Sequence, residues 1–214
     1  MTKILLSSIR REYGTRTLLE ENMASEPITQ FKKWFDEIVS DESEPTAMTV
    51  ATVDESGMPD ARVVLLKGIE EEKFIFYTHY DSSKGRELAK NPKVALNFFW
   101  INSVRQVKIR GIIQKVSAEA SDTYFASRPR NSQLSAVASH QSQVLENRAI
   151  LENQIIKLTK RYGNNEPILR PKQWGGYAVS PVEVEFWQGR DNRLHDRIRY
   201  RKEKMHWVLE RLSP

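Results

Sequence analysis

The chain has 214 residues, of which 39% are hydrophobic and 29% charged, a composition typical of a soluble globular protein with a substantial core. It contains no cysteine, which excludes disulfides, thiolate catalysis and metal sites with cysteine ligands. The net charge of +5 favours an anionic partner such as nucleic acid, an acidic lipid or a phosphorylated small molecule, without choosing among them.

The N-terminal region carries no targeting pattern. Residues 1–11 contain only a brief apolar cluster, and no apolar run in the chain approaches the roughly 18 residues of a membrane helix. We therefore expect a cytoplasmic protein with no membrane contact. Residues 1–26 are polar and weakly patterned, which predicts a partly flexible arm, and residues 27–214 show no repeat or linker and are interpreted as a single domain.

The first helix is predicted from Pro27, a residue suited to a first helical turn. Apolar side chains then recur at helical spacing at Phe31, Trp34, Phe35 and Ile38. From Thr46 the apolar period changes to two, which predicts strands separated by turns. We expect strands at 47–53, 74–78, 94–100 and 106–116, turns at 54–57 and 70–72, and a short helix at 82–90.

Residues 62–67 form a continuous apolar run between Arg62 and Lys67, which is typical of a strand buried on both faces. Further along the chain we expect helices at 118–127 and 144–161, and strands at 181–187, 193–200 and 206–212. Strands before and after a helical insertion at about 118–161 predict a mainly β fold of the α+β class, an antiparallel β-barrel with peripheral helices.

Several enzyme classes lose support at this point. The histidines His79, His140, His195 and His206 show no metal-ligand spacing. The chain has no nucleophile elbow, no P-loop and no dinucleotide fingerprint, which disfavours hydrolase, kinase and Rossmann dehydrogenase functions.

Two basic segments suit phosphate. Lys84 opens a predicted helix just after Ser82 and Ser83, and hydroxyls beside an ammonium at a helix N-terminus can cradle a phosphate, although Ser82 could also be an ordinary helix cap. Residues 124–132 contain groups that suit a phosphomonoester, or else a charged surface turn. These groups are Tyr124, Arg128, Arg130 and Ser132.

The third segment runs from residue 186 to residue 197. Trp187 shares a strand face with Glu183 and Glu185, and an indole on a polar face usually covers a flat or apolar partner. Arg193, His195 and Arg197 alternate and are expected to project to one side, with His195 as acid, base, hydrogen-bond donor or a structural histidine. The seven basic and three acidic residues of 190–204 also allow a nucleic-acid stripe, although no nucleic-acid-binding motif accompanies it.

Together these segments resemble the pyridoxine/pyridoxamine 5'-phosphate oxidase family over nearly the whole chain. The matching strings are Arg10-Arg11-Glu12-Tyr13, Arg62-Val63-Val64-Leu65-Leu66-Lys67, Phe76-Tyr77-Thr78, Arg105-Gln106-Val107, Tyr124-Phe125 through Ser132, Gln141-Ser142, Trp174-Gly175-Gly176, Glu185-Phe186-Trp187-Gln188-Gly189, Arg193-Leu194-His195-Asp196-Arg197 and Arg211-Leu212-Ser213-Pro214. Each string is weak alone, and their order and spacing make the match specific.

The resemblance implies an FMN-binding split β-barrel that works as a homodimer with FMN between the subunits. It places around FMN the residues Arg62, Val63, Val64, Leu65, Leu66, Lys67, Tyr77, Thr78, Ser83, Lys84, Gln106, Gln141, Ser142, Trp187 and Arg197. It places around the substrate Arg10, Arg11, Glu12, Tyr13, Lys67, Tyr124, Arg128, Ser132, Arg193, Leu194 and His195, the first four on a mobile arm. Arg193 and His195 are implied to position the reacting end of the substrate.

The chain departs from the resemblance in three places. Ser83 stands where many relatives have arginine, which predicts a weaker or missing contact to the FMN phosphate. Ser213 replaces the usual alanine near the C-terminus, which should matter little, and residues 14–26 lack the charged residues common there in relatives.

The activity that the resemblance implies is oxidation of pyridoxine 5'-phosphate or pyridoxamine 5'-phosphate to pyridoxal 5'-phosphate, with O2 as acceptor, H2O2 as product and ammonia released from the amine. One alternative is another FMN split-barrel oxidoreductase, either similar to flavin reductases or acting on a different substrate. The other is a non-enzymatic module that binds pyridoxal phosphate or nucleic acid.

Overall fold

The computed structural model describes residues 12–163 and 165–214. The helices are α1 (Pro27–Ile38), α2 (Ser83–Lys90), α3 (Ala118–Ser127), α4 (Arg130–Ala138) and α5 (Arg148–Tyr162). The strands are β1 (Ala47–Val53), β2 (Pro59–Leu65), β3 (Gly68–Glu70), β4 (Lys73–His79), β5 (Lys93–Trp100), β6 (Arg105–Lys115), β7 (Trp174–Gln188), β8 (Asp196–Glu203) and β9 (His206–Leu212). Short 3₁₀ helices occupy Glu20–Asn22 and Asp191–Arg193.

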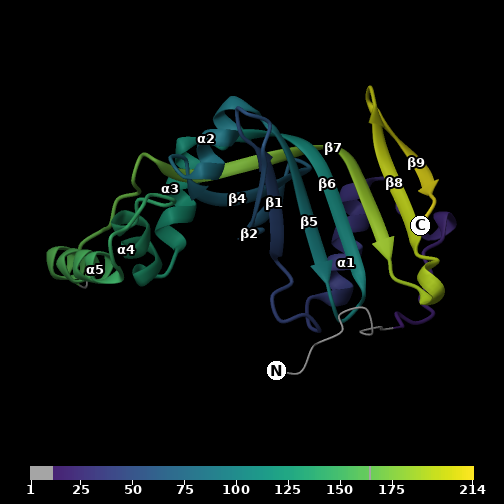
Figure 1. The fold of residues 1–214 in the computed structure, drawn as a ribbon, viewed down its shortest axis with the longest axis horizontal. Helices are drawn as coiled ribbons and strands as arrows, with labels where there is room; N and C mark the ends of the chain where they lie inside the picture. The colour runs from purple at the N-terminus through teal and green to yellow at the C-terminus, as the bar shows by residue number, and fades with distance from the viewer. Residues whose placement is uncertain (1–11, 164) are drawn as a thin grey trace, which may run out of the picture. The chain divides into compact units, whose positions relative to one another are not determined.

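The described strands form one sheet in the order β2-β1-β5-β6-β7-β4-β3, with β8 paired to β7 and β9 to β8 (Figure 1). The pairs β1–β2, β3–β4, β4–β7, β7–β8 and β8–β9 are antiparallel. The predicted mainly β fold with helices is therefore confirmed. No helix among the described residues is long and apolar enough to cross a membrane.

The chain divides into two units by its internal contacts. The first comprises residues 1–45, 97–110 and 182–214, and the second comprises residues 46–96 and 111–181. The interpretation of 1–26 as an arm and 27–214 as a single domain stays a prediction.

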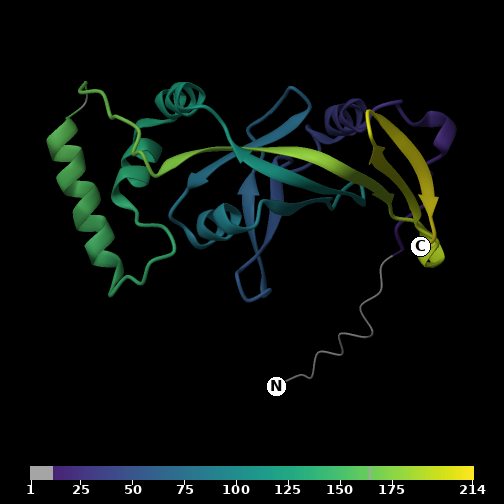
Figure 2. The same cartoon turned by 90° about the horizontal axis from the view of Figure 1, so that it is seen from above.

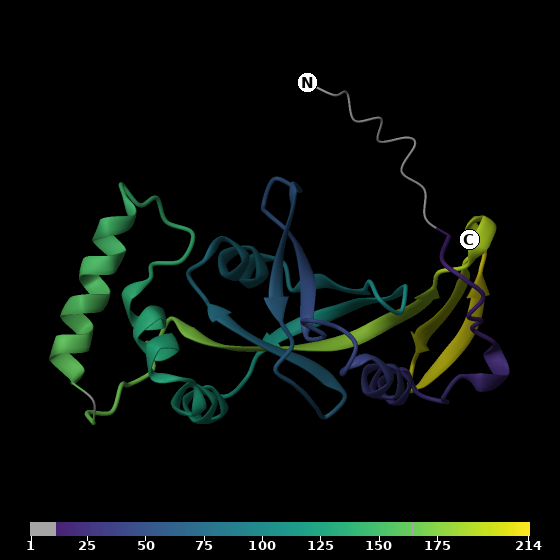
Figure 3. The same cartoon turned by 90° about the horizontal axis from the view of Figure 1, so that it is seen from below.

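The core of the first unit forms around α1, as its helical spacing predicts. Phe31 and Trp34 are buried on this helix, with Phe31 5.1 Å from the ring of Phe98 and Trp34 5.1 Å from that of Phe186. Figures 2 and 3 show α1 beside the β8–β9 hairpin, and Tyr200 on β8 donates to the carbonyl of Ala24, just before the helix. Each of these buried aromatic side chains contributes about 2–3 kcal/mol by leaving water.

In the second unit the predicted turn joins β1 and β2 into a hairpin, which Figure 3 shows near α2. The Asp54 carboxylate closes the turn by accepting from the amides of Ser56 and Met58 at 2.8 and 2.9 Å. These bonds, with the Ser56 hydroxyl first among them, lower the pKa of Asp54. Thr52 on β1 donates to Glu87 on α2, which ties the helix to the hairpin.

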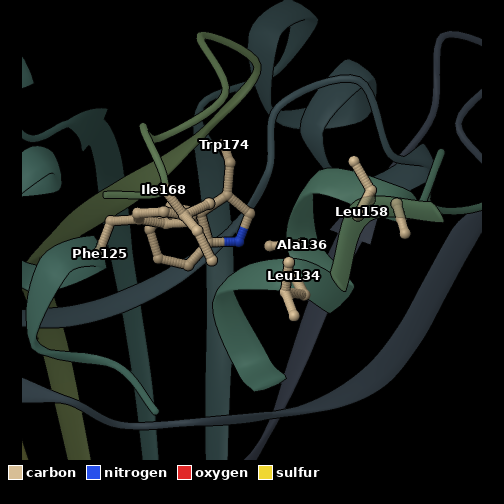
Figure 4. Packing of buried hydrophobic residues seen from close by; sticks show 7 residues of the cluster. Phe125, Leu134, Ala136, Leu158, Ile168 and Trp174 are labelled. Atoms are coloured by element: carbon tan, nitrogen blue, oxygen red, sulfur yellow. The ribbon is translucent and has the colours of Figure 1, made fainter. Parts of the chain in front are cut away.

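A smaller apolar cluster joins α3, α4, α5 and the start of β7 within the second unit (Figure 4). The ring of Phe125 lies 5.2 Å from that of Trp174, with Ile168 beside them, while Leu134 and Ala136 on α4 lie toward Leu158 on α5. The structure therefore has three helices in the predicted insertion, and α4 is one that the sequence did not predict.

The prediction that residues 62–67 form a strand buried on both faces is wrong. β2 ends at Leu65 and stands at the end of the strand order, where its described partner is β1 alone. Val63 is 66% exposed, whereas Leu66, just past the strand, is buried. The apolar run therefore lies largely on an edge strand, and one edge of β2 has no partner strand among the described residues.

Strand β7 begins at Trp174, seven residues before the strand that we predicted at 181. Gly175 and Gly176 look like a loop signal in the sequence, but glycine is needed here for packing. A Cβ on Gly176 would lie 2.7 Å from the ring of Tyr77 and 2.6 Å from a methyl group of Val116. The backbone of β7 therefore approaches β4 more closely than a larger residue would allow.

Candidate functional site

The second unit contains a cavity of about 530 Å³, which we call the cationic cavity. β2, β4, α2, α3 and α4 all contribute to its lining. It brings together these predicted site residues: Val63, Val64, Leu65, Lys67, Tyr77, Thr78, Lys84, Tyr124, Arg128, Ser132 and Gln141. Segments that are far apart in sequence, from Lys67 to Gln141, thus place lysine, arginine, hydroxyl and amide groups around one space.

Lys84 is a buried cation held by neutral oxygens. Its Nζ lies 3.1 Å from Oε1 of Gln141, 3.3 Å from Oγ1 of Thr78 and 3.5 Å from Oγ of Ser82. Among the described residues it forms no ion pair. Burial, followed by repulsion from Arg62, lowers the pKa of Lys84. An anion in the cavity would supply the missing counter-charge.

Arg128 is a second cation that forms no ion pair among the described residues, and it is half-buried. Its guanidinium stacks 4.6 Å from the centre of the Trp174 ring, and its buried Nη1 has no hydrogen-bond partner among the residues that the structure describes. Burial lowers the pKa of Arg128. A buried guanidinium nitrogen without an acceptor is costly unless a ligand supplies one, and a phosphate oxygen is a suitable acceptor.

Aromatic rings form one wall of the cavity. Tyr77 and Tyr124 stack with ring centres 3.8 Å apart at 16°, and Trp174 lies 5.5 Å from Tyr77 at 13°. Burial raises the pKa of both tyrosines, so both keep their phenolic protons at neutral pH and can donate hydrogen bonds.

In the first unit, Trp187, His195 and Tyr13 form a separate group. The His195 ring lies 4.7 Å from the Trp187 ring, and Tyr13 lies 5.7 Å from His195 and 6.2 Å from Trp187. The backbone amide of Arg190 donates to Nδ1 of His195 at 3.1 Å. Trp187, which the sequence left without a partner on a polar face, is thus partly covered by two rings of its own chain.

The prediction that Arg193, His195 and Arg197 alternate along one strand is wrong. β8 begins only at Asp196, and residues 191–193 form a 3₁₀ helix in which Asn192 and Arg193 have φ of 56° and 61°. Arg193 and Leu194 are exposed in this loop, and only Arg197 of the three lies on the strand. The sequence alternation of basic residues therefore imitates a strand where the backbone turns.

Arg197 and its neighbours on β8 are paired with carboxylates. Arg197 Nε donates to buried Glu185 at 2.7 Å, and Lys108 bonds the other oxygen of this carboxylate. Burial alone would raise the pKa of Glu185, but the hydrogen bonds from Arg197 and Lys108 outweigh it and lower the pKa. Arg199 and Arg201 both pair with Glu210. These pairs leave little free positive charge for a nucleic-acid stripe.

Several predicted site residues lie elsewhere. Arg62 bonds Thr52, Asp60 and Glu87, the last at 3.1 Å, and it does not line the cationic cavity. Ser83 faces a different hollow and accepts from Arg86 at 3.4 Å.

Four other predicted residues also lie outside the lining of the cationic cavity. Ser142 lines a neighbouring cavity of about 440 Å³, which Gln141 also lines, while Leu66 is buried and Gln106 is half-buried on β6. Glu12 is exposed next to Tyr13. Arg10 and Arg11 lie outside the described residues.

Comparisons with known proteins show the family of the chain. Residues 35–162 match the family model described as "Pyridoxamine 5'-phosphate oxidase", and residues 174–214 match "Pyridoxine 5'-phosphate oxidase C-terminal dimerisation region". A pyridoxine/pyridoxamine 5'-phosphate oxidase of Legionella pneumophila (strain Paris) is 52% identical, with 98% of this chain and 97% of that protein covered. The chain belongs to the pyridoxamine 5'-phosphate oxidase family. Its relative of the same name in Acaryochloris marina (strain MBIC 11017) is 50% identical, with 100% and 97% covered.

Solved structures related to this oxidase family share the fold. PhzG from Burkholderia lata 383, in complex with tetrahydrophenazine-1-carboxylic acid, has a TM-score of 0.86 and 30% identity and covers 92% of this chain and 98% of its own. A pyridoxamine 5'-phosphate oxidase-related, FMN-binding protein from Nostoc punctiforme PCC 73102 has a TM-score of 0.72 at 16% identity, with 90% and 100% covered. The split-barrel fold that the family resemblance implied is confirmed.

Two residues that the sequence did not single out belong to this site or support its backbone. His79 lines the cationic cavity; burial, followed by Lys84, lowers its pKa. Gln133 is buried and donates from Nε2 to the carbonyls of Phe125 and Arg128 at 3.0 and 3.1 Å, which fixes the backbone that carries Arg128. The position of His79 directly after Thr78 at the end of a strand was a usable signal for the first; nothing in the sequence marked Gln133.

Proposed function

We propose that this chain oxidises pyridoxine 5'-phosphate or pyridoxamine 5'-phosphate to pyridoxal 5'-phosphate, using FMN as cofactor. O2 is the electron acceptor, H2O2 is a product, and the amine substrate releases ammonia. The relatives at about 50% identity carry the name of this activity over their full length.

The observation that carries the proposal is the buried, unpaired Nη1 of Arg128 in a cavity shared with Lys67, Tyr124 and Ser132. A substrate phosphate supplies the acceptor that Arg128 lacks, while the hydroxyls and the lysine offer further donors. Binding energy from the phosphate end holds the substrate without touching the carbon that reacts.

The residues around Lys84 fit a second phosphate, that of FMN. Lys84, Thr78 and Gln141 offer an ammonium, a hydroxyl and an amide within 3.3 Å of one another, with the positive end of α2 nearby. FMN, when bound, accepts a hydride equivalent from the substrate and passes the electrons to O2. The protein's own part is to hold both phosphates and exclude water around the rings.

We propose that Arg193, His195 and Trp187 contact the reacting end of the substrate. Because Nδ1 of His195 accepts from the Arg190 amide, the neutral ring carries its proton on Nε2. His195 therefore serves as a hydrogen-bond donor toward the substrate, and we assign it no role as an obligatory base. We propose a homodimer with FMN between the subunits, because residues 174–214 match a dimerisation region.

One spectroscopic experiment tests this function. Purified protein reconstituted with FMN is expected to lose its flavin absorbance when pyridoxamine 5'-phosphate is added without oxygen, and to regain it when air is admitted. The proposal would be rejected if the protein bound no FMN, or if the bound flavin stayed oxidised with both substrates.

The similarity to PhzG raises a second candidate, an oxidase whose substrate carries a carboxylate and no phosphate. Arg128, Lys67 and Tyr124 would then have less to bind, because a carboxylate has fewer oxygens and less charge than a phosphomonoester. Anaerobic reduction by a tetrahydrophenazine carboxylate but not by pyridoxine 5'-phosphate would favour this candidate.

A further inference from the structure

The segment that carries Tyr13 is pinned to the loop before β8 by a reciprocal pair of hydrogen bonds. The amide of Gly14 donates to Oδ1 of Asp191 at 2.7 Å, and the amide of Asp191 donates to the carbonyl of Gly14 at 3.3 Å. Gly14 adopts φ of +87°, a conformation that other residues rarely take. A two-way contact between residues 177 apart in sequence fixes both the position and the direction of the segment.

The pin determines where the Tyr13 ring lies. Tyr13 directly precedes Gly14, and its ring contacts both His195 and Trp187. A Cβ on Gly189 would lie 3.1 Å from Cβ of Tyr13, so the backbone of Tyr13 also lies close to the end of β7. Tyr13 is nevertheless 38% exposed, so these contacts cover its side chain only in part.

A second anchor lies further along the same segment and does not involve Asp191. The amide of Leu18 donates to Oδ2 of Asp196 at 3.0 Å, and Arg211 donates to the carbonyl of Leu18 at 2.8 Å. Arg211 also pairs with Glu20 at 2.6 Å. This anchor holds residues 18–20, so loss of the Asp191 carboxylate should release only the residues before them.

We propose that Asp191 is a positioning residue that pins Gly14 and thereby holds Tyr13 against His195 at the substrate's reacting end. The inference rests on the proposed function, in which His195 donates a hydrogen bond toward the substrate. The carboxylate acts through Gly14 and touches no reacting atom. It is suited to this task because a charged acceptor makes a stronger hydrogen bond to an amide than a neutral one.

The test compares Asp191→Ala with Asp191→Asn in the FMN-loaded enzyme, by amide hydrogen exchange and steady-state kinetics. Asp191→Ala should speed exchange at the Gly14 amide at least tenfold, leave exchange at Leu18 unchanged and raise KM for pyridoxine 5'-phosphate about tenfold with FMN still bound. Asp191→Asn keeps an acceptor oxygen, so its exchange rate at Gly14 and its KM should fall between those of the unsubstituted enzyme and those of Asp191→Ala. Glu203→Ala, in an exposed pair with Arg201, is the matched control and should change neither readout.

Gly14→Ala provides an independent variant. A Cβ at this position meets nothing within 4 Å, so the substitution strains only the backbone. It should reproduce the changes of Asp191→Ala, and the double variant should be no worse than either single one, because both break the same contact.

Two outcomes would overturn the inference. Unchanged exchange at Gly14 in Asp191→Ala would show that the pin does not hold the segment. Faster exchange with an unchanged KM would show that the pin has no role in positioning. Failure of the proposed function is distinguishable, since the unsubstituted enzyme would then oxidise neither substrate while the exchange comparison still reports on the pin.

Discussion

The cationic cavity and the β7–β8–β9 region treat positive charge in opposite ways. In the cavity, buried Lys84 and half-buried Arg128, whose Nη1 is buried, have no carboxylate partner among the described residues, and burial lowers the pKa of each. In the β7–β8–β9 region, Arg197 pairs with Glu185 and Arg199 with Glu210.

This difference distinguishes cations suited to bind a ligand from cations that stabilise the fold, and the sequence alone does not make that distinction. An unpaired buried cation costs stability and is explained by a ligand that pairs with it, whereas a cation with a buried carboxylate partner stabilises the fold. By this criterion the paired arginines Arg197, Arg199 and Arg201 are structural, and we propose that the cations of the cavity bind the ligand.

The largest effect is expected at Glu185, on the paired side of the comparison. Glu185→Ala leaves Arg197 and Lys108 without their shared partner and should lower the free energy of unfolding by about 3 kcal/mol. Urea denaturation measures this change. Because the pKa of Glu185 is lowered in the fold, its contribution is present above the unfolded pKa near 4.5 and is lost as pH falls through the folded pKa.

The control for Glu185 is Glu203→Ala, which removes a carboxylate from an exposed pair with Arg201. Its cost should stay below about 0.5 kcal/mol, because exposed pairs contribute little. Equal costs for the two variants would mean that burial does not distinguish these pairs.

Arg128 should give the next largest effect, on substrate affinity. Arg128→Met removes the charge and keeps an apolar chain over Trp174, and we expect KM for either phosphate substrate to rise about 30-fold, or about 2 kcal/mol. Stability should not fall, because the variant also removes a buried nitrogen without a hydrogen-bond partner. A clear loss of melting temperature with an unchanged KM would assign Arg128 to the structure.

Lys84→Met should weaken FMN binding about tenfold, because it removes the ammonium that we propose for the FMN phosphate. The lowered pKa of Lys84 also predicts how stability changes with pH. Its pKa in the folded chain lies below the ordinary 10.5, so the unfolded chain binds more protons between those two values, and stability rises with pH across that window. Melting temperatures of FMN-free protein from pH 7 to 10.5 should show this rise relative to Lys84→Met. Saturating FMN should remove the rise, since a phosphate favours the charged ammonium.

The sequence predicts elements well where local periodicity and burial agree. The apolar spacing of α1, the Ser82 cap of α2 and the alternation of Val107 and Ile109 on β6 all appear in the structure. The sequence does not predict α4, because its buried residues include Gln133 directly beside Leu134 and so form no helical stripe of apolar residues. The sequence does not predict the loop at 190–195, because no sequence pattern indicates the positive φ of Asn192 and Arg193.

The cationic cavity was largely predictable as a set of residue types, but the partner of each charge was not. Arg62 looks as available as Lys84 in the sequence, and only the fold brings Asp60 and Glu87 to its guanidinium. Family resemblance supplied the grouping of residues between segments, because no local rule relates Lys67 to Arg128.

The smallest effect is expected at Ser83, where the family resemblance leads us to expect an arginine. Ser83→Arg adds a cation at the start of α2 and should tighten FMN binding about twofold to fivefold, or about 0.5–1 kcal/mol, since the site is half-exposed and Arg86 nearby repels the new charge. Fluorescence titration of FMN measures the change, and Ser83→Gln controls for side-chain size. The gain should shrink in high salt, because exposed charges are screened. A gain shared by Ser83→Gln would show that size rather than charge is limiting at this position.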